Sequence, residues 1–297
     1  MEKVLLGKTG IKVPRVIFGG IIVTDEKQED ADRFVSHAID AGVDFFDVAP
    51  GYGNAEEKLG PALKRYRNKA TLACKTQERT AKGARESLEN SLRKLQTDYF
   101  DLFQLHALAE VGDVDKVFAN DGAMSTIIKA KEEGLIRHIG FTAHNEETAI
   151  LALSKFDFET VMFPINWALG LGSDFSKRLP ELCKEKQIGL IAMKSLVHRR
   201  WRKGEKAAYP KSWCKPIFDN DRLGICAIKY AFSRHAATIV PPGNFEHFCF
   251  AVKHIDECLA NPLDDADIKF LRDSLPDKED QFFVVSDEGR KTEGNQE

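Results

Sequence analysis

Short apolar runs alternate with longer amphipathic segments along most of this chain, and this alternation constrains the fold more than any other feature. The runs have the length of buried strands, and the segments between them have the periodicity of helices. Eight runs are present, at 15–19, 43–47, 71–75, 100–106, 135–141, 161–164, 188–192 and 237–240. Strands that alternate with helices predict a parallel sheet with helical crossovers.

The segments between the runs supply those crossovers. We expect helices near 26–41, 55–66, 80–95, 122–133, from 146, and near 174–186, 221–234 and 244–259, with a short one at 264–273. Eight strand–helix units within about 250 residues match the (β/α)8 barrel, or TIM barrel, of the α/β class. Residues 2–14 precede the first unit and are predicted to form a β-hairpin that turns at 7–10.

A doubly wound nucleotide-binding fold is the alternative architecture. Its first strand–helix turn would carry G-x-G-x-x-G, whereas residues 18–23 read Phe-Gly-Gly-Ile-Ile-Val. The barrel is therefore favoured. We expect a single domain over 1–297, with a flexible polar tail from about 280 to 297. Two connections exceed the usual two to six residues: 107–121 after the fourth strand and 194–220 after the seventh.

Composition narrows the class of protein. The 43 Lys and Arg against 46 Asp and Glu give a net charge of −3, which does not suggest a nucleic-acid or acidic-membrane partner. The six cysteines include no CxxC pair, so we predict no metal site and reduced thiols in a cytoplasmic protein. We see no signal peptide, and no stretch approaches the ~18 apolar residues that a transmembrane helix needs.

Three predicted strands end in ionisable residues. Asp47 closes the second strand, with Tyr52 five residues later between two glycines, while Lys75 ends the third strand and His106 the fourth. Strand C-terminal ends meet at one face of a barrel, so these four side chains are predicted to come together. A nearby ammonium lowers the pKa of a phenol. Tyr52 then becomes a general acid tuned by Lys75, with Asp47 holding the ammonium and His106 orienting a substrate carbonyl.

Proton donation to a carbonyl needs a second reagent, because the carbon must receive a hydride. No side chain supplies one, so a nicotinamide cofactor is the natural partner. With these residues the chain resembles the aldo-keto reductase superfamily, and in particular its microbial members. The resemblance rests on the block from Asp47 to Gly53, on Lys75 and His106, and on the run 134–141 into the fifth strand. It implies reduction of a small aldehyde or ketone by NADP(H), with NAD(H) also possible.

The resemblance also implies where the cofactor lies, although several positions depart from the family pattern. Ala143 stands where the family has an asparagine, Met162 replaces a glutamine, and Met193 replaces an aromatic residue that stacks on nicotinamide. The segment 241–247, where the family holds the 2′-phosphate, has no Lys or Arg, although amides after Gly243 could bind phosphate. The cofactor contacts expected by position are Gly19, Gly20, Thr142, Asn145, Met162, Met193, Lys194, Pro242, Gly243, Asn244 and His247.

Two other functions remain open. The departures at the cofactor positions are also typical of a nicotinamide-binding regulatory protein with little catalysis. Lys75 could instead form a Schiff base with a carbonyl substrate, as in lyases built on other barrels. The sequence identifies neither the carbonyl substrate nor the oligomeric state. Candidates for aromatic walls or for gripping an anion in the loop 194–220 are Trp201, Tyr209, Trp213, Arg199, Arg200 and Arg202.

Overall fold

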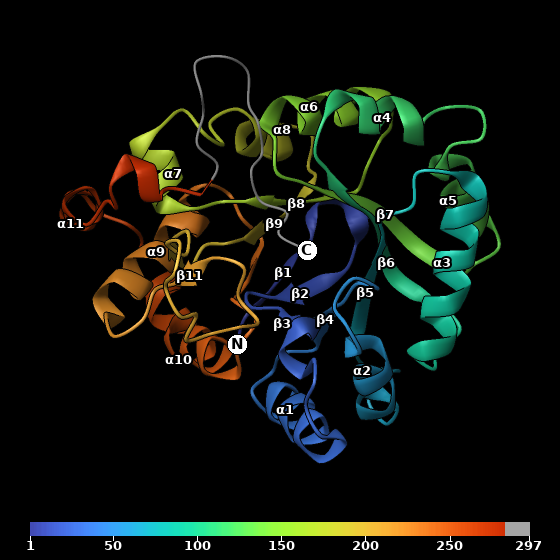
Figure 1. The fold of residues 1–297 in the computed structure, drawn as a ribbon, viewed down its shortest axis with the longest axis horizontal. Coiled ribbons are helices and arrows are strands. Elements are labelled where there is room, and N and C mark those ends of the chain that lie inside the picture. Colours follow the sequence, from blue (N-terminus) through green and yellow to red (C-terminus); the bar gives the residue numbers. More distant parts are fainter. Residues whose placement is uncertain (283–297) are drawn as a thin grey trace.

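The computed structural model describes residues 1–282, and its eight parallel strands form a nearly closed barrel surrounded by helices (Figure 1). The barrel strands are β3 (Phe18–Gly19), β4 (Phe45–Asp47), β5 (Thr71–Thr76), β6 (Phe100–Leu108), β7 (Ile136–Ala143), β8 (Thr160–Pro164), β9 (Gly189–Met193) and β12 (Thr238–Val240). The barrel closes between the two end strands, where Val16 pairs with Ile239 and Ile17 N donates to Ile239 O at 2.9 Å. The predicted (β/α)8 barrel is confirmed.

Helices cover the outside of the barrel on all sides of the view in Figure 1. Those expected from the sequence are α1 (Gln28–Asp40), α2 (Ala55–Leu63), α3 (Ala81–Lys94), α5 (Ala123–Glu132), α6 (Glu146–Lys155), α8 (Leu179–Glu185), α9 (Asp221–Ser233), α10 (Phe245–Ala260) and α11 (Asp265–Asp273). Local sequence explains where several begin. The Thr80 hydroxyl, for example, caps α3 by accepting from Gly83 N at 3.2 Å, and Leu88 on this helix is fully buried.

The structure differs from the sequence prediction in three connections. The loop after the fourth strand contains α4 (Val111–Val117), and the loop after the seventh contains a small antiparallel pair, β10 (Val197–Arg199) with β11 (Lys215–Pro216). The helix expected near 174–186 begins only at Leu179, and α7 (Trp167–Gly172) precedes it. Elements this short show too few repeats of their period to be recognised in a sequence.

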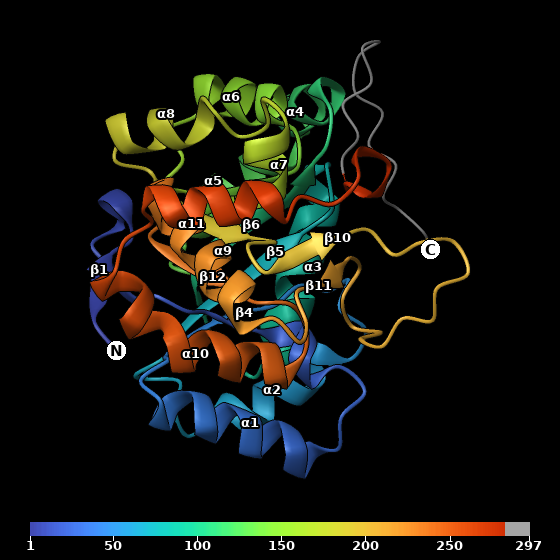
Figure 2. The same ribbon diagram turned by 90° about the vertical axis from the view of Figure 1, so that its left-hand side faces the viewer.

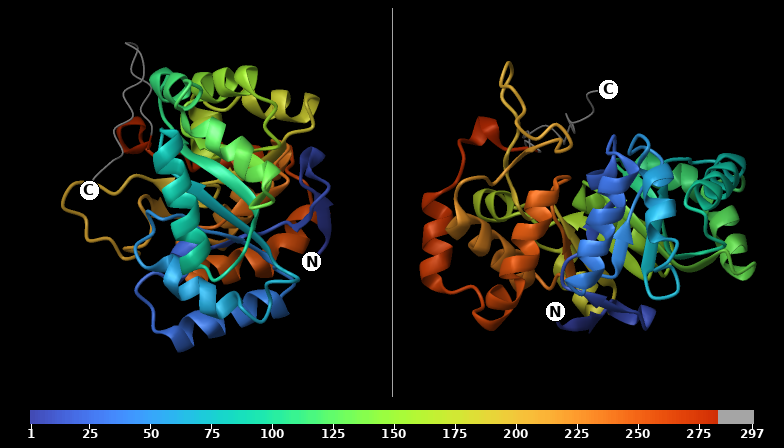
Figure 3. Two further views of the ribbon diagram at one scale, coloured as in Figure 1. Left: turned by 90° about the vertical axis from the view of Figure 1, so that its right-hand side faces the viewer. Right: turned by 90° about the horizontal axis from the view of Figure 1, so that it is seen from below.

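The N-terminal hairpin closes the end of the barrel opposite the strand C-termini. Strand β1 (Lys3–Leu5) pairs antiparallel with β2 (Lys12–Pro14), as predicted, around the 3-10 turn η1 (Gly7–Thr9). Gly7 has φ +54°, and a Cβ atom there would lie 2.2 Å from Gly189 N. The hairpin therefore rests directly on the start of β9. Figure 2 and the right panel of Figure 3 show it at the opposite end of the barrel from the long loop after β9.

The barrel interior is an apolar plug with a polar layer above it. The plug comprises Leu6, Val13, Ile17, Phe45, Ala73, Leu102, Met162 and Ile191. Side chains alternate across a strand, so the residue two positions further on points inward again. From Phe45, Ala73 and Leu102 this rule leads to Asp47, Lys75 and Gln104, all buried. The strands thus place three polar side chains side by side at their C-terminal ends.

The residues that begin the predicted tail are packed on the barrel. The 3-10 turn η3 (Lys278–Asp280) ends in a carboxylate that pairs with Arg202, and Phe282 is buried. Residues 280–282 of the predicted tail are therefore packed on the barrel through an ion pair and apolar burial. The remainder of this tail, 283–297, lies outside the described residues. Within residues 1–282, no helix has both the length and the apolar character that crossing a membrane requires. All six cysteines are unpaired.

Candidate active site

Lys75 links Asp47 and Tyr52 at the C-terminal ends of β4 and β5. Its ammonium forms an ion pair with the Asp47 carboxylate, and both side chains are almost fully buried. The same nitrogen lies 3.3 Å from the Tyr52 hydroxyl and 3.4 Å from the Val48 carbonyl oxygen. It also lies 5.0 Å from the centroid of the Tyr52 ring. The structure therefore brings together the acid, the ammonium and the phenol that the sequence singled out.

Gln104 completes this group and was not among the residues singled out from the sequence. Its side-chain amide is buried and donates to Asp47 Oδ1 at 3.2 Å. This bond keeps the carboxylate turned toward Lys75. A signal was present in the sequence, because Gln104 lies two positions before His106 on one strand and so shares its inward face.

Burial dominates the electrostatics of the group. It raises the pKa of Asp47, although the charge of Lys75 opposes the shift. Burial alone would lower the pKa of Lys75, but the attraction of Asp47 and Tyr52 outweighs it and raises the pKa above its ordinary value. The pKa of Tyr52 is also raised by burial; Lys75 opposes this shift and Asp47 adds to it.

The expectation of a lowered Tyr52 pKa is therefore wrong. Asp47 largely neutralises the ammonium that would favour phenolate, so desolvation of the phenol decides the balance. The phenol consequently stays protonated at neutral pH. This is the state in which it can give a proton away, and Lys75 still lies where it would stabilise the phenolate that remains.

His106, at the end of β6, presents a neutral imidazole beside the phenol. The two rings lie edge to face, with centroids 6.1 Å apart and an interplanar angle of 88°. Burial, with the nearby cations Lys75 and Arg79, lowers the pKa of His106 to about 3. Its Nδ1 is buried and has no hydrogen-bond partner among residues 1–282. If the proton is on Nε2, the buried Nδ1 is an unpaired acceptor rather than an unpaired N–H donor. We therefore assign the proton to Nε2, which makes Nε2–H available as a hydrogen-bond donor.

A cavity of about 100 Å³ opens beside these residues, and Asp47 and Tyr52 line it. Six of the residues expected to contact the cofactor line it too: Gly19, Met162, Met193, Lys194, Pro242 and Gly243. The remaining wall is largely apolar, with Ile21 and Val240 among its members. An apolar wall beside a proton donor suits one face of a nicotinamide ring.

The other five residues expected to contact the cofactor do not line this cavity, and each of them makes contacts within the chain. Thr142 Oγ1 accepts from Ala107 N at 2.7 Å, and Asn145 Oδ1 caps α6 by accepting from Glu147 N and Thr148 N. Gly20 packs on Val48, where a Cβ atom would lie at 2.9 Å. These contacts arise because helix caps and strand ends attract hydroxyls and amides whether or not a ligand is near.

Asn244 and His247 hold the loop after β9. Asn244 Nδ2 donates to Ser212 Oγ at 2.9 Å, and the His247 ring packs on Tyr209 with centroids 4.7 Å apart. Burial lowers the pKa of His247, so its imidazole is neutral. Glu246 occupies the first turn of α10. The start of this helix therefore carries an acidic side chain, which weakens it as a phosphate site.

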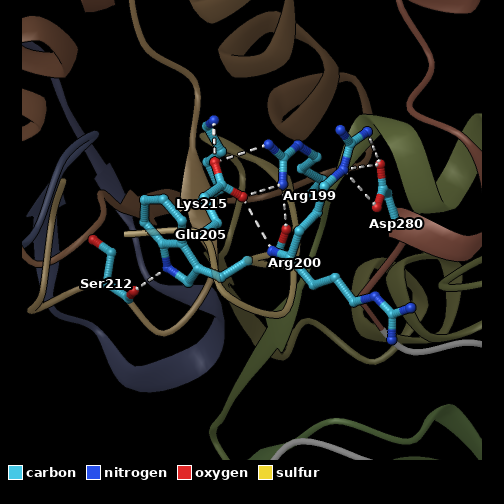
Figure 4. Close-up of polar contacts among 8 residues, drawn as sticks. Arg199, Arg200, Glu205, Ser212, Lys215 and Asp280 are labelled. Atoms are coloured by element: carbon cyan, nitrogen blue, oxygen red, sulfur yellow. Dashed lines mark hydrogen bonds and ion pairs between the residues drawn. The ribbon is translucent and has the colours of Figure 1, made fainter. Parts of the chain in front are cut away.

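The segment 199–215 contributes residues 211–214 to the cavity wall and is stabilised by charge pairs (Figure 4). Glu205 accepts from both terminal nitrogens of Arg199 at 2.8 and 3.0 Å and from Lys215 at 2.6 Å. Arg202 pairs with Asp280. Carboxylates of this chain thus pair with Arg199 and Arg202, two of the three arginines predicted to grip a phosphate or an acidic substrate. Arg200 remains exposed.

Two side chains of this segment reach the mouth of the barrel. Lys211 Nζ donates to Ile22 O at 2.8 Å and to Glu26 Oε1 at 2.5 Å, so it ties the segment to the loop after β3. The Trp213 ring lies 5.7 Å from the Tyr52 ring and is 66% exposed. Trp213 therefore forms an aromatic wall beside the phenol. Trp201 instead donates to Ser212 O at 2.9 Å within the segment.

A larger hollow, of about 680 Å³, lies at the opposite end of the barrel between the hairpin and the ends of α8 and α9. It contains none of the four predicted catalytic residues. Sites in (β/α)8 barrels lie at the strand C-terminal ends, so the smaller cavity is the candidate. Within residues 1–282, no three His, Cys, Asp or Glu side chains gather in a way that could hold a metal ion.

The sequence pattern of the aldo/keto reductase family matches residues 15–214. The chain belongs to the aldo/keto reductase family. It is similar to L-galactose dehydrogenase of Arabidopsis thaliana, with 30% identity over 207 residues that cover 64% of each protein. It is also similar to aldo-keto reductase YhdN of Bacillus subtilis (strain 168), with 36% identity over 125 residues that cover 36% of this chain and 38% of that one. The match thus spans less than two thirds of either relative.

A solved structure shares the architecture. Aldo-keto reductase AKR11C1 from Bacillus halodurans, in its holo form, superposes with a TM-score of 0.71 at 20% identity and covers 93% of this chain and 97% of that one. At this identity the likeness concerns the fold.

Proposed function

We propose that this aldo/keto reductase reduces a small aldehyde or ketone to an alcohol, with Tyr52 as the general acid. The observation that carries the proposal is the buried Lys75 ammonium, which lies 3.3 Å from the Tyr52 hydroxyl at the edge of the cavity and is paired with Asp47. In this arrangement the Tyr52 hydroxyl donates a proton, and the Lys75 ammonium then stabilises the phenolate that remains. The neutral His106 imidazole donates a hydrogen bond to the carbonyl oxygen and directs it toward the phenol.

The residues around the cavity fit the nicotinamide end of NAD(P)H. Met162, Met193 and Val240 provide an apolar wall for the ring. When bound, the cofactor supplies a hydride to the carbonyl carbon. Tyr52 gives its hydroxyl proton to the carbonyl oxygen, and water returns a proton to Tyr52 afterwards. The chain's own residues therefore bind, orient and protonate the substrate.

The test is the replacement Tyr52→Phe, which removes the proton donor and keeps the ring that packs on Trp213. Turnover of a panel of reactive aldehydes and ketones, followed as NADPH or NADH oxidation, should fall by roughly 10²–10⁴-fold. Cofactor binding, measured by quenching of tryptophan fluorescence, should not change. Full activity of the Tyr52→Phe protein would refute the assigned role. The same titration with NADH and NADPH establishes which cofactor the protein prefers.

A regulatory nicotinamide-binding protein is the second candidate, favoured by the altered carboxamide positions. Ala143 and Met162 offer no polar group, and the Asn145 and Asn166 side chains cap α6 and α7. This function predicts tight cofactor binding with negligible turnover across the panel. Rapid turnover of any simple aldehyde would exclude it.

Schiff-base chemistry at Lys75 is disfavoured by the geometry. An amine nucleophile needs a lowered pKa, whereas the pairing with Asp47 raises the pKa of Lys75. Borohydride should therefore trap no substrate on Lys75, and peptide mass mapping after reduction measures this directly.

A further inference from the structure

Strand β6 contains an irregularity immediately after His106. Leu105 pairs with Phe141 on β7, and the next pair is Leu108 with Ala143. Three steps along β6 therefore correspond to two along β7, which is a β-bulge with one extra residue. Ala107, inside the bulge, has φ +53°, an unfavourable backbone conformation for a residue with a Cβ atom. The surrounding structure must hold it in place.

The extra residue lets two side chains face the correct sides of the sheet. Leu105 and Leu108 both belong to the core between the sheet and the helices, although they are three positions apart. In a regular strand, residues three apart point to opposite faces. Without the bulge, either His106 would leave the inner face or Leu108 would leave the outer core. The bulge therefore keeps the imidazole beside Tyr52 while the strand remains anchored.

Side chains, rather than the strand ladder, satisfy the main chain of the bulge. Thr142, the residue of β7 that lies between the two pairs, accepts from Ala107 N at 2.7 Å. Arg79, in the loop after β5, donates from one terminal nitrogen to His106 O at 2.9 Å and to Ala107 O at 3.0 Å. Both the N–H and the C=O of Ala107 thus depend on these two side chains.

Arg79 is itself held in a fixed position. Its other terminal nitrogen donates to Gln77 O at 3.0 Å, and its Nε donates to Asp113 Oδ1 at 3.2 Å. Asp113 in turn accepts from Ala109 N at 2.9 Å at the start of α4. The guanidinium therefore ties the β5–α3 loop, the end of β6 and the start of α4 together around the bulge.

We propose that Arg79 and Thr142 are positioning residues that hold the His106–Ala107 bulge and thereby keep the His106 imidazole beside the Tyr52 hydroxyl. The inference deepens the proposed function and rests on it for its catalytic consequence. Neither residue touches the phenol, so each acts through the backbone of β6. The charged and titratable groups around the imidazole are Lys75 from β5, Arg79 itself, Tyr52 from the β4–α2 loop and His144 from the β7–α6 loop.

The experiment compares two variants that break the bulge contacts with two matched controls. Arg79→Met removes the donors to both carbonyls, and Arg85→Met makes the same change on α3, where Arg85 pairs with Glu89 and Glu133 at the surface. Thr142→Val removes the hydroxyl with little change of shape, whereas Thr142→Ser retains it. The first measurement is the NMR signal of the His106 ring, identified by its disappearance in His106→Gln. The second measurement determines kcat and the NAD(P)H dissociation constant separately for each variant.

In Arg79→Met and Thr142→Val the His106 signal should move, because the imidazole leaves its edge-to-face position on Tyr52. In both variants kcat should fall by up to about 10²-fold, as misplacement of a catalytic group does, and in Arg79→Met the cofactor affinity should be retained. Thr142→Ser and Arg85→Met should keep the wild-type signal. An unmoved His106 signal in both Arg79→Met and Thr142→Val overturns the proposal.

The two proposals fail in different ways. A wild-type protein without turnover would refute the proposed function, yet the ring signal would still report whether Arg79 and Thr142 hold His106. Should Arg79→Met not fold, the comparison of Thr142→Val with Thr142→Ser decides by itself.

Discussion

At the scale of single residues, the buried ion pair of Lys75 and Asp47 has the largest desolvation cost. Two opposite charges are buried in the barrel, and the Gln104 amide supplies an additional bond to the carboxylate. A buried pair of this kind contributes little net stability, but removal of one partner leaves a charge without compensation. The same two side chains therefore affect both the folding stability of the barrel and the environment of Tyr52.

Lys75→Met is expected to destabilise the protein by about 3–5 kcal/mol, because the buried Asp47 carboxylate loses its counter-ion. The double variant Lys75→Met/Asp47→Asn should lose less than Lys75→Met alone, since no charge then remains in the apolar site. Urea unfolding of the wild type, the two single variants and the double variant forms a double-mutant cycle that measures the coupling. Additive losses would show that the two side chains are not coupled.

At the scale of elements, the segment 199–215 determines access to the site. Lys211 joins it to the loop after β3, and the cavity beneath holds about 100 Å³. This is below the roughly 300–1,000 Å³ of ordinary ligand pockets. We therefore expect the segment to move when the proposed cofactor binds, and the Lys211 contacts would oppose that movement.

Lys211→Ala should speed both association and dissociation of NAD(P)H, because the segment then opens more readily. Stopped-flow tryptophan fluorescence measures both rates. Lys206→Ala, an exposed lysine of the same segment, is the matched control and should leave the rates unchanged. Equal rates for Lys211→Ala and the wild type would mean that cofactor enters without release of this contact.

The N-terminal hairpin makes a second prediction at this scale. Gly7→Ala places a methyl group against the backbone of Gly189, so we expect a loss of about 1–3 kcal/mol from overpacking, in addition to strain at positive φ. Gly10→Ala also has positive φ but meets nothing within 4 Å, and it should cost about 1 kcal/mol. Thermal unfolding of the two variants measures both losses, and the difference between them is the part due to steric contact with β9. Equal losses would mean that the hairpin does not press on β9.

For the whole molecule, the neutral, half-buried His106 predicts how stability depends on pH. The pKa of His106 is about 3 in the fold, against 6.5 as its ordinary value. Between these values the unfolded chain binds a proton that the folded chain does not. The contribution of His106 to stability is therefore fully present above pH 6.5 and is lost as the pH falls toward 3.

Acidification from about pH 7.5 to about pH 4.5 should cost the wild type about 2–3 kcal/mol more than His106→Gln, at about 1.4 kcal/mol per pH unit below 6.5. The comparison with His106→Gln cancels the contributions of the other titrating groups. Urea unfolding at the two pH values measures the difference. Parallel losses in the two proteins would mean that the imidazole is charged in the fold.

Local pattern was sufficient for the architecture and for part of the site. Strand–helix alternation is a property of neighbouring residues, so it predicted the eight units and the hairpin. Asp47, Tyr52, Lys75 and His106 were found because parallel strands must end at one face of a closed sheet. The short elements α4, α7, β10 and β11 escaped because each is stabilised by tertiary contacts rather than by its own period.

The electrostatics and the assignments of polar contacts were decided by the tertiary structure alone. The Tyr52 pKa depends on burial and on Asp47, which adjacency in the sequence does not reveal. Thr142 and Asn145 have hydroxyl and amide groups suited to a cofactor, yet the fold places a bulge and a helix start beside them. Sequence order specifies which groups approach the barrel mouth. Which of them remain available for a ligand depends on desolvation and on competition among partners in three dimensions.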